Sequence, residues 1–313
     1  MRHILRILQH APLEQPAADE AGRAYDAVAD DYLRYVDGSV EQLFNFDSRY
    51  AFADREVWRR IDGALVDLRT QGREHVRILD LGCGPGTWLM RAALHARALG
   101  FTAIETRGID ISAELIGMAQ RSASRIHVPG IALDFAVQDL EAALAGETAD
   151  SCDLILCLYG VLNHLPAVRH AAIADALARV ATGHVILTVR AAGSPPSVFV
   201  TGIEDTLAYR QDHVHDRLSV DLKDGRHLEF YSHLFTADEA RRLFTPRLEL
   251  RELVGLDLFH SRFKFDPNWH RDEPVDARFE SRLSGLERLC ASDPEMIDHA
   301  AHILLSCTAR PRV

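Results

Sequence analysis

Five short apolar segments between Val76 and Arg190 constrain the fold of this chain most strongly. They are VRILDL (76–81), TRGIDI (106–111), IALDFAV (131–137), DLILCLY (153–159) and HVILTVR (184–190). Helical patterns separate several of them, as in VRHAAIADALARV (168–180), whose apolar residues recur at spacings of three and four. Apolar strands that alternate with helices predict a parallel sheet covered on both faces. Right-handed crossovers then give a doubly wound α/β fold.

Composition limits what such a chain can bind. The 313 residues are 47% hydrophobic and 26% charged, which is typical of a globular protein rather than a disordered chain or a fibre. The formal charge of −11 opposes attraction to nucleic-acid phosphates. The longest apolar run, LILCLYGVL, is about half the ~20 residues that a membrane helix needs. We therefore expect a small-molecule partner, with no nucleic acid and no membrane.

The cysteines indicate the compartment. Five are present, an odd number, at wide spacing and without a CxxC pair, so neither a disulfide framework nor a structural zinc site is expected. Arg6 interrupts the short apolar start of the chain, which does not favour a signal peptide. A reducing, cytoplasmic location fits these observations best.

The strongest single motif is ILDLGCGPGT, in which a strand enters three closely spaced glycines and a helix begins near Thr87. A dinucleotide site would place a glycine at position 87, and a Walker loop would continue with Gly-Lys-Ser or Gly-Lys-Thr. Asp80 would repel a diphosphate but would favour an ammonium group. The loop therefore indicates a ligand that carries an ammonium and a carboxylate beside a nucleoside.

Four motifs in order, ILDLGCGPG, GIDIS, VQDLEA and DLILCLYGVLNHL, resemble the class I S-adenosylmethionine-dependent methyltransferases of small-molecule type. The resemblance covers Val76 to Arg190. It implies a seven-stranded, mostly parallel, Rossmann-like sheet with an N-terminal helical cover. It also implies S-adenosyl-L-methionine as the cofactor.

The resemblance also assigns roles in cofactor binding. An acid at Asp110 can accept the ribose hydroxyls, and Asp139 can accept the adenine amino hydrogen; alternatively, Asp110 caps its strand and Asp139 caps a helix. Tyr32, in YDAVADDY, either reaches the cofactor or docks its helix on the core. Cys83 can also be a small filler of the loop. The expected cofactor-binding set is Tyr32, Asp80, Gly82, Cys83, Gly84, Asp110, Ile111, Asp139, Leu140 and Tyr159.

Candidates for the acceptor side lie in two places. Methyl transfer mainly needs alignment of the acceptor, and it needs a base only when the acceptor loses a proton. Asn163 and His164 are polar residues in an apolar stretch, and His164 is either a general base or a partner of a backbone carbonyl. Tyr231 and His233 lie on one side of a late alternating strand that lines a cavity or faces water. We expect His164, Tyr231 and His233 as catalytic residues, and these three with Asn163 as substrate-binding residues.

No metal site is expected. His213 and His215 could share one face of a strand, but no clear third ligand accompanies them, so a solvated hairpin is the better interpretation. Thr236 is the expected N-cap of a helix over TADEARRLF, with Glu239 as its capping-box partner. Residues 255–293 have a weak, mixed pattern.

Two domain-level units are predicted, a helical arm or lid over 1–72 and a cofactor-binding domain over 73–313 with insertions after residue 190. Within the arm, residues 11–20 are expected to be loose. The expected function is methyl transfer to an oxygen or nitrogen of a small molecule. Alternatives are aminocarboxypropyl transfer or cyclisation with the same cofactor, a regulatory module without chemistry, and an RNA methyltransferase. The last would need an exposed arginine track, for which the nearest candidates are Arg241, Arg242, Arg247 and Arg251.

Overall fold

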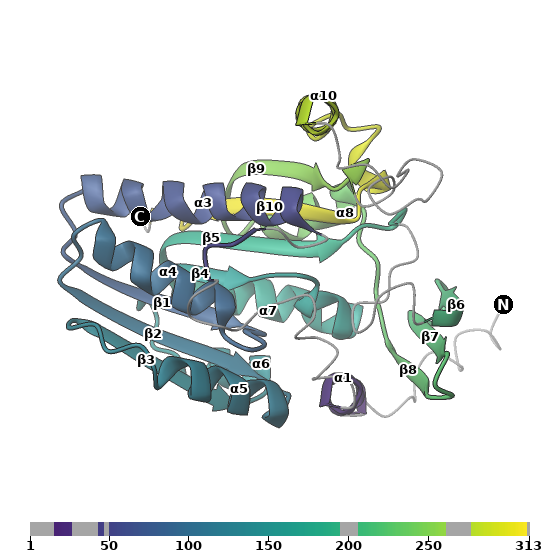
Figure 1. Cartoon of the computed structure of the whole chain (residues 1–313), viewed down its shortest axis with the longest axis horizontal. Coiled ribbons are helices and arrows are strands. Elements are labelled where there is room, and N and C mark those ends of the chain that lie inside the picture. The colour runs from purple at the N-terminus through teal and green to yellow at the C-terminus, as the bar shows by residue number, and fades with distance from the viewer. Residues whose placement is uncertain (1–15, 27–42, 47–49, 195–205, 261–276, 312–313) are drawn as a thin grey trace, which may run out of the picture.

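The computed structural model describes residues 16–26, 43–46, 50–194, 206–260 and 277–311, and its centre is a seven-stranded sheet (Figure 1). The strand order is β3-β2-β1-β4-β5-β10-β9. The first five strands pair in parallel, whereas β10 is antiparallel to both of its neighbours. The strands are β1 (His75–Leu81), β2 (Ala103–Asp110), β3 (Ile131–Val137), β4 (Cys152–Cys157), β5 (Ala181–Arg190), β9 (Glu249–Leu256) and β10 (His302–Thr308). The predicted doubly wound, mostly parallel sheet is confirmed.

Helices cover both faces of this sheet. One apolar cluster joins it to α3, α4 and α5, and a second joins it to α6, α7 and α8. Their bounds are α3 (Ala51–Thr70), α4 (Thr87–Ala98), α5 (Ala113–Ala123), α6 (Leu140–Gly146), α7 (Ala167–Val180) and α8 (Ala237–Phe244). Successive residues of β1 show why both faces are needed, because Ile78 belongs to the first cluster and Leu79 to the second.

A separate three-stranded antiparallel sheet follows β5, in the order β6-β7-β8. Its strands are β6 (Thr206–Asp212), β7 (Arg217–Leu222) and β8 (His227–Tyr231). Helix α1 (Pro16–Asp26) packs on it, with Ala24 in the cluster formed by the buried face of β7 and β8. Figure 1 shows α1 and this sheet together at one end of the molecule, beyond the end of β5.

Several predicted boundaries differ from the structure. The arm expected to be loose through Glu20 is already helical from Pro16. The alternating pattern HLEFYSHLF continues to Phe235, but the strand ends at Tyr231 because His233 turns away to pair with Asn163. The predicted helix that carries YDAVADDY lies, beyond Asp26, outside the described residues.

Strand β4 ends two residues earlier than expected, and the chain then turns sharply. Tyr159 and Gly160 both have positive φ, 56° and 87°. This conformation is rare for a residue with a side chain, and it directs the chain into the short 3₁₀ helix η3 (Val161–His164). The turn places η3 beside the carboxyl ends of the parallel strands.

Two further helices lie between β9 and β10 in the described part of the chain. Helix α10 (Ala277–Cys290) and the 3₁₀ helix η5 (Ile297–His299) precede β10. The mixed pattern predicted for 255–293 therefore includes one clear helix. Within the described residues, no helix has the length and apolar character needed to cross a membrane.

Candidate functional site

A pocket lies at the carboxyl ends of β1, β2 and β4, where open α/β sheets bind ligands. Its empty volume, including space open to solvent, is about 730 Å³. The lining residues are Ala21, Tyr25, Gly82, Gly84, Ile109, Asp110, Ile111, Leu115, Gln138, Asp139, Leu140, Leu158, Tyr159, Val161, His164 and Leu165.

The glycine loop forms the floor of this pocket. Gly82, Gly84 and Gly86 all have positive φ, which explains why the sequence uses glycine there. A Cβ on Gly82 would lie 2.2 Å from Cγ2 of Val161, so the loop also needs glycine to pack beneath η3. Gly86 then precedes the first turn of α4.

Asp110 joins the end of β2 to this loop. Its Oδ2 accepts the Gly84 amide at 2.8 Å, and its Oδ1 accepts the Ser112 amide at 2.9 Å. Burial raises the pKa of Asp110, and the two amide bonds oppose that rise. Each carboxylate oxygen can accept more than one hydrogen bond, so Asp110 can bind a ligand while it holds the loop.

Asp139 is the N-cap of α6, one of the two roles weighed for it from the sequence. Its Oδ1 accepts the amides of Glu141 and Ala142 at 2.9 and 3.1 Å. Asp139 also lines the pocket beside Leu140. The Asp139 carboxylate can accept a hydrogen bond from the edge of a planar base, while Leu140 packs against the face of that base.

Neither Asp80, near the end of β1, nor Cys83, within the loop, belongs to the pocket lining. Asp80 is 2% exposed, and among the described residues its Oδ2 has no hydrogen-bond partner. Burial, together with the nearby Asp110, raises the pKa of Asp80 to about 8. A cationic group at the loop would relieve this destabilised carboxylate. Cys83 is buried, and its Sγ lies 3.0 Å from where a Cβ on Gly108 would be, as expected for a filler.

Tyr25, on α1, and His164, on η3, contact each other in the pocket lining. Their Oη and Nε2 atoms are 3.1 Å apart, and Nδ1 of His164 lies 3.1 Å from the Tyr231 carbonyl oxygen. A carbonyl only accepts hydrogen bonds, so Nδ1 carries the proton and Nε2 keeps its lone pair. Burial lowers the pKa of His164 to about 4, which keeps the ring neutral near pH 7.

Asn163 is fully buried and does not line the pocket. Its side chain accepts the Arg190 amide at 2.9 Å and donates to the His233 carbonyl oxygen. The structure thus places Asn163 as a tie between η3, the end of β5 and the segment after β8.

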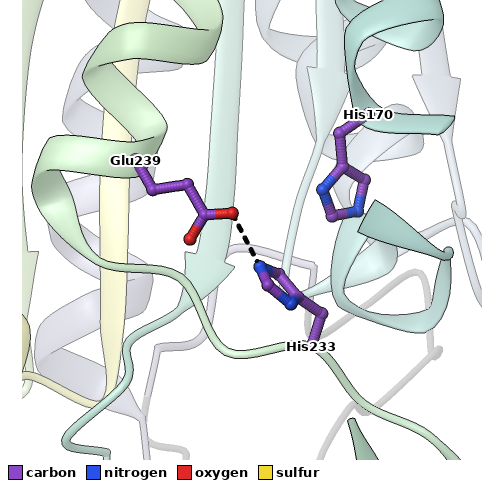
Figure 2. A group of neighbouring side chains, drawn as sticks. All are labelled: His170, His233 and Glu239. Carbon is purple, nitrogen blue, oxygen red and sulfur yellow. Dashed lines mark hydrogen bonds and ion pairs between the residues drawn. The ribbon is translucent and has the colours of Figure 1, made fainter. Parts of the chain in front are cut away.

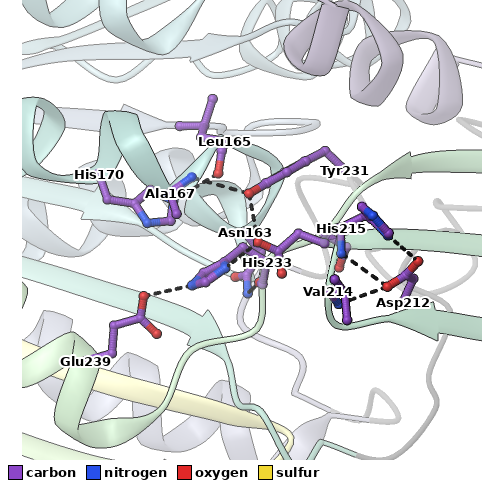
Figure 3. Close-up of polar contacts among 12 residues, drawn as sticks. Asn163, Leu165, Ala167, His170, Asp212, Val214, His215, Tyr231, His233 and Glu239 are labelled. Carbon is purple, nitrogen blue, oxygen red and sulfur yellow. Dashed lines mark hydrogen bonds and ion pairs between the residues drawn. The ribbon is translucent and has the colours of Figure 1, made fainter. Parts of the chain in front are cut away.

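Tyr231 and His233 lie behind η3, in a polar network with Asp216 and Glu239 (Figure 3). Tyr231 Oη and His233 Nδ1 both donate to Asp216 Oδ2, at 2.9 and 2.8 Å. Neither residue is in the pocket lining. Burial disfavours the charged ring of His233, but its bonds to Glu239 and Asp216 outweigh burial and raise its pKa.

Sequence reasoning missed Ala21 and Tyr25, which close one side of the pocket from α1. Tyr25 is the first residue of YDAVADDY, the same segment from which Tyr32 is predicted to reach the cofactor. Tyr32 lies outside the described residues. His215 is exposed and pairs with Asp212 in the β6–β7 turn, as a solvated hairpin requires.

Comparisons with known proteins agree with this geometry. Residues 78–184 match the family model described as a methyltransferase domain. A search of curated proteins gives no match. The chain is similar to the solved structure of an S-adenosylmethionine-dependent methyltransferase from Clostridium acetobutylicum, at 12% identity and a TM-score of 0.50 over 92% of this chain and 99% of that one.

A second similar structure is the cyclopropane synthase MmaA2 from Mycobacterium tuberculosis. It is 14% identical, with a TM-score of 0.51 over 95% of this chain and 99% of that one. At these identities the two likenesses show a shared fold.

Proposed function

Because residues 78–184 match a methyltransferase domain, we propose that this chain is a class I S-adenosylmethionine-dependent methyltransferase that methylates an oxygen or nitrogen atom of a small molecule held beneath α1. The observation that supports this most is the pocket itself. Asp110 and Asp139 line it together with the glycine loop, and Tyr25 and His164 line it as well.

The residues present fit S-adenosylmethionine. Asp110 would accept the ribose hydroxyls, Asp139 the adenine amino hydrogen, and Ile111 and Leu140 would contact the adenine ring. Asp80, whose Oδ2 has no hydrogen-bond partner among the described residues, would ionise beside the ammonium and offer it negative charge. When bound, the cofactor supplies a methyl group on a sulfonium, which is already a good leaving group.

The chain's own contribution is then alignment, exclusion of water and, for an acceptor that carries a proton, a base. Helix α1 covers the pocket with Ala21 and Tyr25, and it is held by an ion pair of 2.6 Å between Glu20 and Arg217. Neutral His164 keeps a lone pair on Nε2, toward which Tyr25 Oη lies. That lone pair can take the proton of a hydroxyl or amine acceptor. A covered pocket of this kind favours a small acceptor over a nucleic acid.

Isotope transfer tests the proposal. The protein is incubated with methyl-labelled S-adenosylmethionine and a cell extract divided into low-molecular-mass and macromolecular fractions. We expect label in an O-methyl or N-methyl compound of the small fraction, with S-adenosylhomocysteine as by-product and no transfer by Asp110→Ala. Label confined to protein or RNA, or methylthioadenosine as the by-product, would contradict it.

A further inference from the structure

We propose that His170, His233 and Glu239 bind one divalent transition-metal ion, with zinc as the ion that suits this ligand set best. The three side chains come from α7, from the segment after β8 and from the first turn of α8, and they converge (Figure 2). Their candidate ligand atoms all lie within 4.8 Å of one another. Two imidazoles and one carboxylate, with a fourth position left for water, form a known zinc ligand set.

The surroundings of His233 orient it as a ligand. Its Nδ1 donates to Asp216 Oδ2 at 2.8 Å, which leaves Nε2 directed at Glu239 Oε1, also at 2.8 Å. Metal-binding histidines almost always donate their other ring N–H to a carboxylate or a carbonyl in this way. Asp216 is itself fixed, since it also accepts from Tyr231 Oη and its backbone has a φ of 52°.

His170 has the matching arrangement. Its Nε2 lies 3.0 Å from the carbonyl oxygens of both Leu162 and Leu165. Because carbonyls only accept, Nε2 must carry the proton, and Nδ1 keeps the lone pair. Figure 2 shows the ring with one nitrogen on the side of Glu239. His170 is thus held in a tautomer that leaves one lone pair for a metal, whereas His233 would release to solvent the Nε2 proton that it shares with Glu239 when the ion binds.

Glu239 differs from its predicted role in a way that supports the site. The Thr236 hydroxyl accepts the Glu239 amide at 3.1 Å, as an N-cap should, but the Glu239 carboxylate pairs with His233 instead of completing a capping box. Its side chain is 34% exposed, so it gives the cluster access to solvent. Tetrahedral zinc holds its ligand atoms about 3.3 Å apart, so the widest pair would have to close by up to about 1.5 Å.

The ion would lie behind η3, on the side away from the pocket lining. Nε2 of His170 lies within hydrogen-bond distance of the Leu162 and Leu165 carbonyl oxygens. The His233 amide donates to the Asn163 carbonyl oxygen, and the Asn163 side-chain amide donates to the His233 carbonyl oxygen. A metal there would fasten α7, α8 and the segment after β8 to one wall of the pocket. It would therefore stabilise the site and not take part in methyl transfer.

Metal binding to the tag-free, full-length protein tests this. After chelator treatment and dialysis, zinc uptake is measured by calorimetry, and Co²⁺ is used as an absorption probe. We expect one equivalent of zinc and the visible bands of tetrahedral Co²⁺. Glu239→Gln should weaken zinc binding at least tenfold, Asp216→Asn about 10–100-fold, and His215→Gln, the matched control on the exposed hairpin, not at all.

Two results would overturn the proposal. One is a wild-type protein that takes up no zinc, and the other is binding that survives Glu239→Gln but is lost in His215→Gln, which would place the ion on the hairpin. If Glu239→Gln does not fold, crystals of the wild type soaked in zinc decide. An anomalous peak bonded to His170, His233 and Glu239 supports the site, and a peak elsewhere or none refutes it.

Discussion

Asp110 Oδ2 accepts the backbone amide of Gly84 at 2.8 Å, so the last residue of β2 and the glycine loop form one unit. The same carboxylate accepts the Ser112 amide, just before α5 begins. Asp110 therefore has two functions at once. It sets the shape of the loop, and it offers its remaining lone pairs to the pocket that it lines.

Replacing Asp110 with alanine should damage both functions. Each lost hydrogen bond to a charged group is worth about 1.5–3 kcal/mol, so we expect S-adenosylhomocysteine affinity to fall at least about tenfold. The free energy of unfolding should fall by about 1–3 kcal/mol, because two amides lose their partner. Calorimetry and urea denaturation measure the two effects. Asp134→Ala, on the exposed side of β3, is the control, and equal binding by both variants would refute the role of Asp110.

Asp80 predicts a trade-off between stability and binding. In the folded chain its pKa is raised from 3.8 to about 8, so the folded state keeps a proton that the unfolded state releases near pH 4. Its contribution to stability is therefore lost as pH rises from about 4 to 8. At pH 8 the free energy of unfolding of Asp80→Asn should exceed that of the wild type by on the order of a few kcal/mol. At pH 4 it should not. Its cofactor affinity should be lower.

Urea denaturation at several pH values checks the first half of that prediction, and calorimetry checks the second. Asp134→Asn again serves as the control. A stability difference that stays constant from pH 4 to pH 8 would show that Asp80 does not titrate as described. Unchanged cofactor affinity would remove it from the binding site.

His164 predicts a loss of stability in acid. Burial lowers its pKa from 6.5 to about 4, so between these values the unfolded chain binds a proton that the folded chain does not. Stability should therefore fall as pH drops from about 6.5 to 4, by up to about 3 kcal/mol from this group. His164→Gln should flatten that part of the curve, whereas the exposed His215→Gln should leave it unchanged. Identical slopes in all three proteins would contradict the burial of a neutral His164.

Local signals explain what could be predicted from the sequence. The apolar strands and the glycine loop follow from neighbouring residues, and β1 differs from its prediction by a single residue. The N-cap at Thr236 follows from a three-residue spacing for the same reason.

Contacts between distant segments explain what could not be predicted. Tyr25 meets His164 across 139 positions because α1 packs beside η3, and His233 meets Asp216 across 17 because β7 pairs with β8. His213 and His215 stand out as possible metal ligands in the sequence because they are only two residues apart. His170 and Glu239 are brought together by α7 and α8 packing on the same face of the sheet, which no spacing rule reveals.

The most direct test is calorimetric titration of S-adenosylhomocysteine into the wild type, Gly82→Ala and Gly63→Ala. A Cβ at Gly82 would lie 2.2 Å from Val161 in a backbone with a φ of 70°, whereas a Cβ at Gly63 on α3 meets nothing within 4 Å. We predict one site in the wild type, the same affinity in Gly63→Ala, and at least tenfold weaker binding in Gly82→Ala. No binding by the wild type, or equal binding by all three proteins, would contradict the assignment of this pocket to the cofactor.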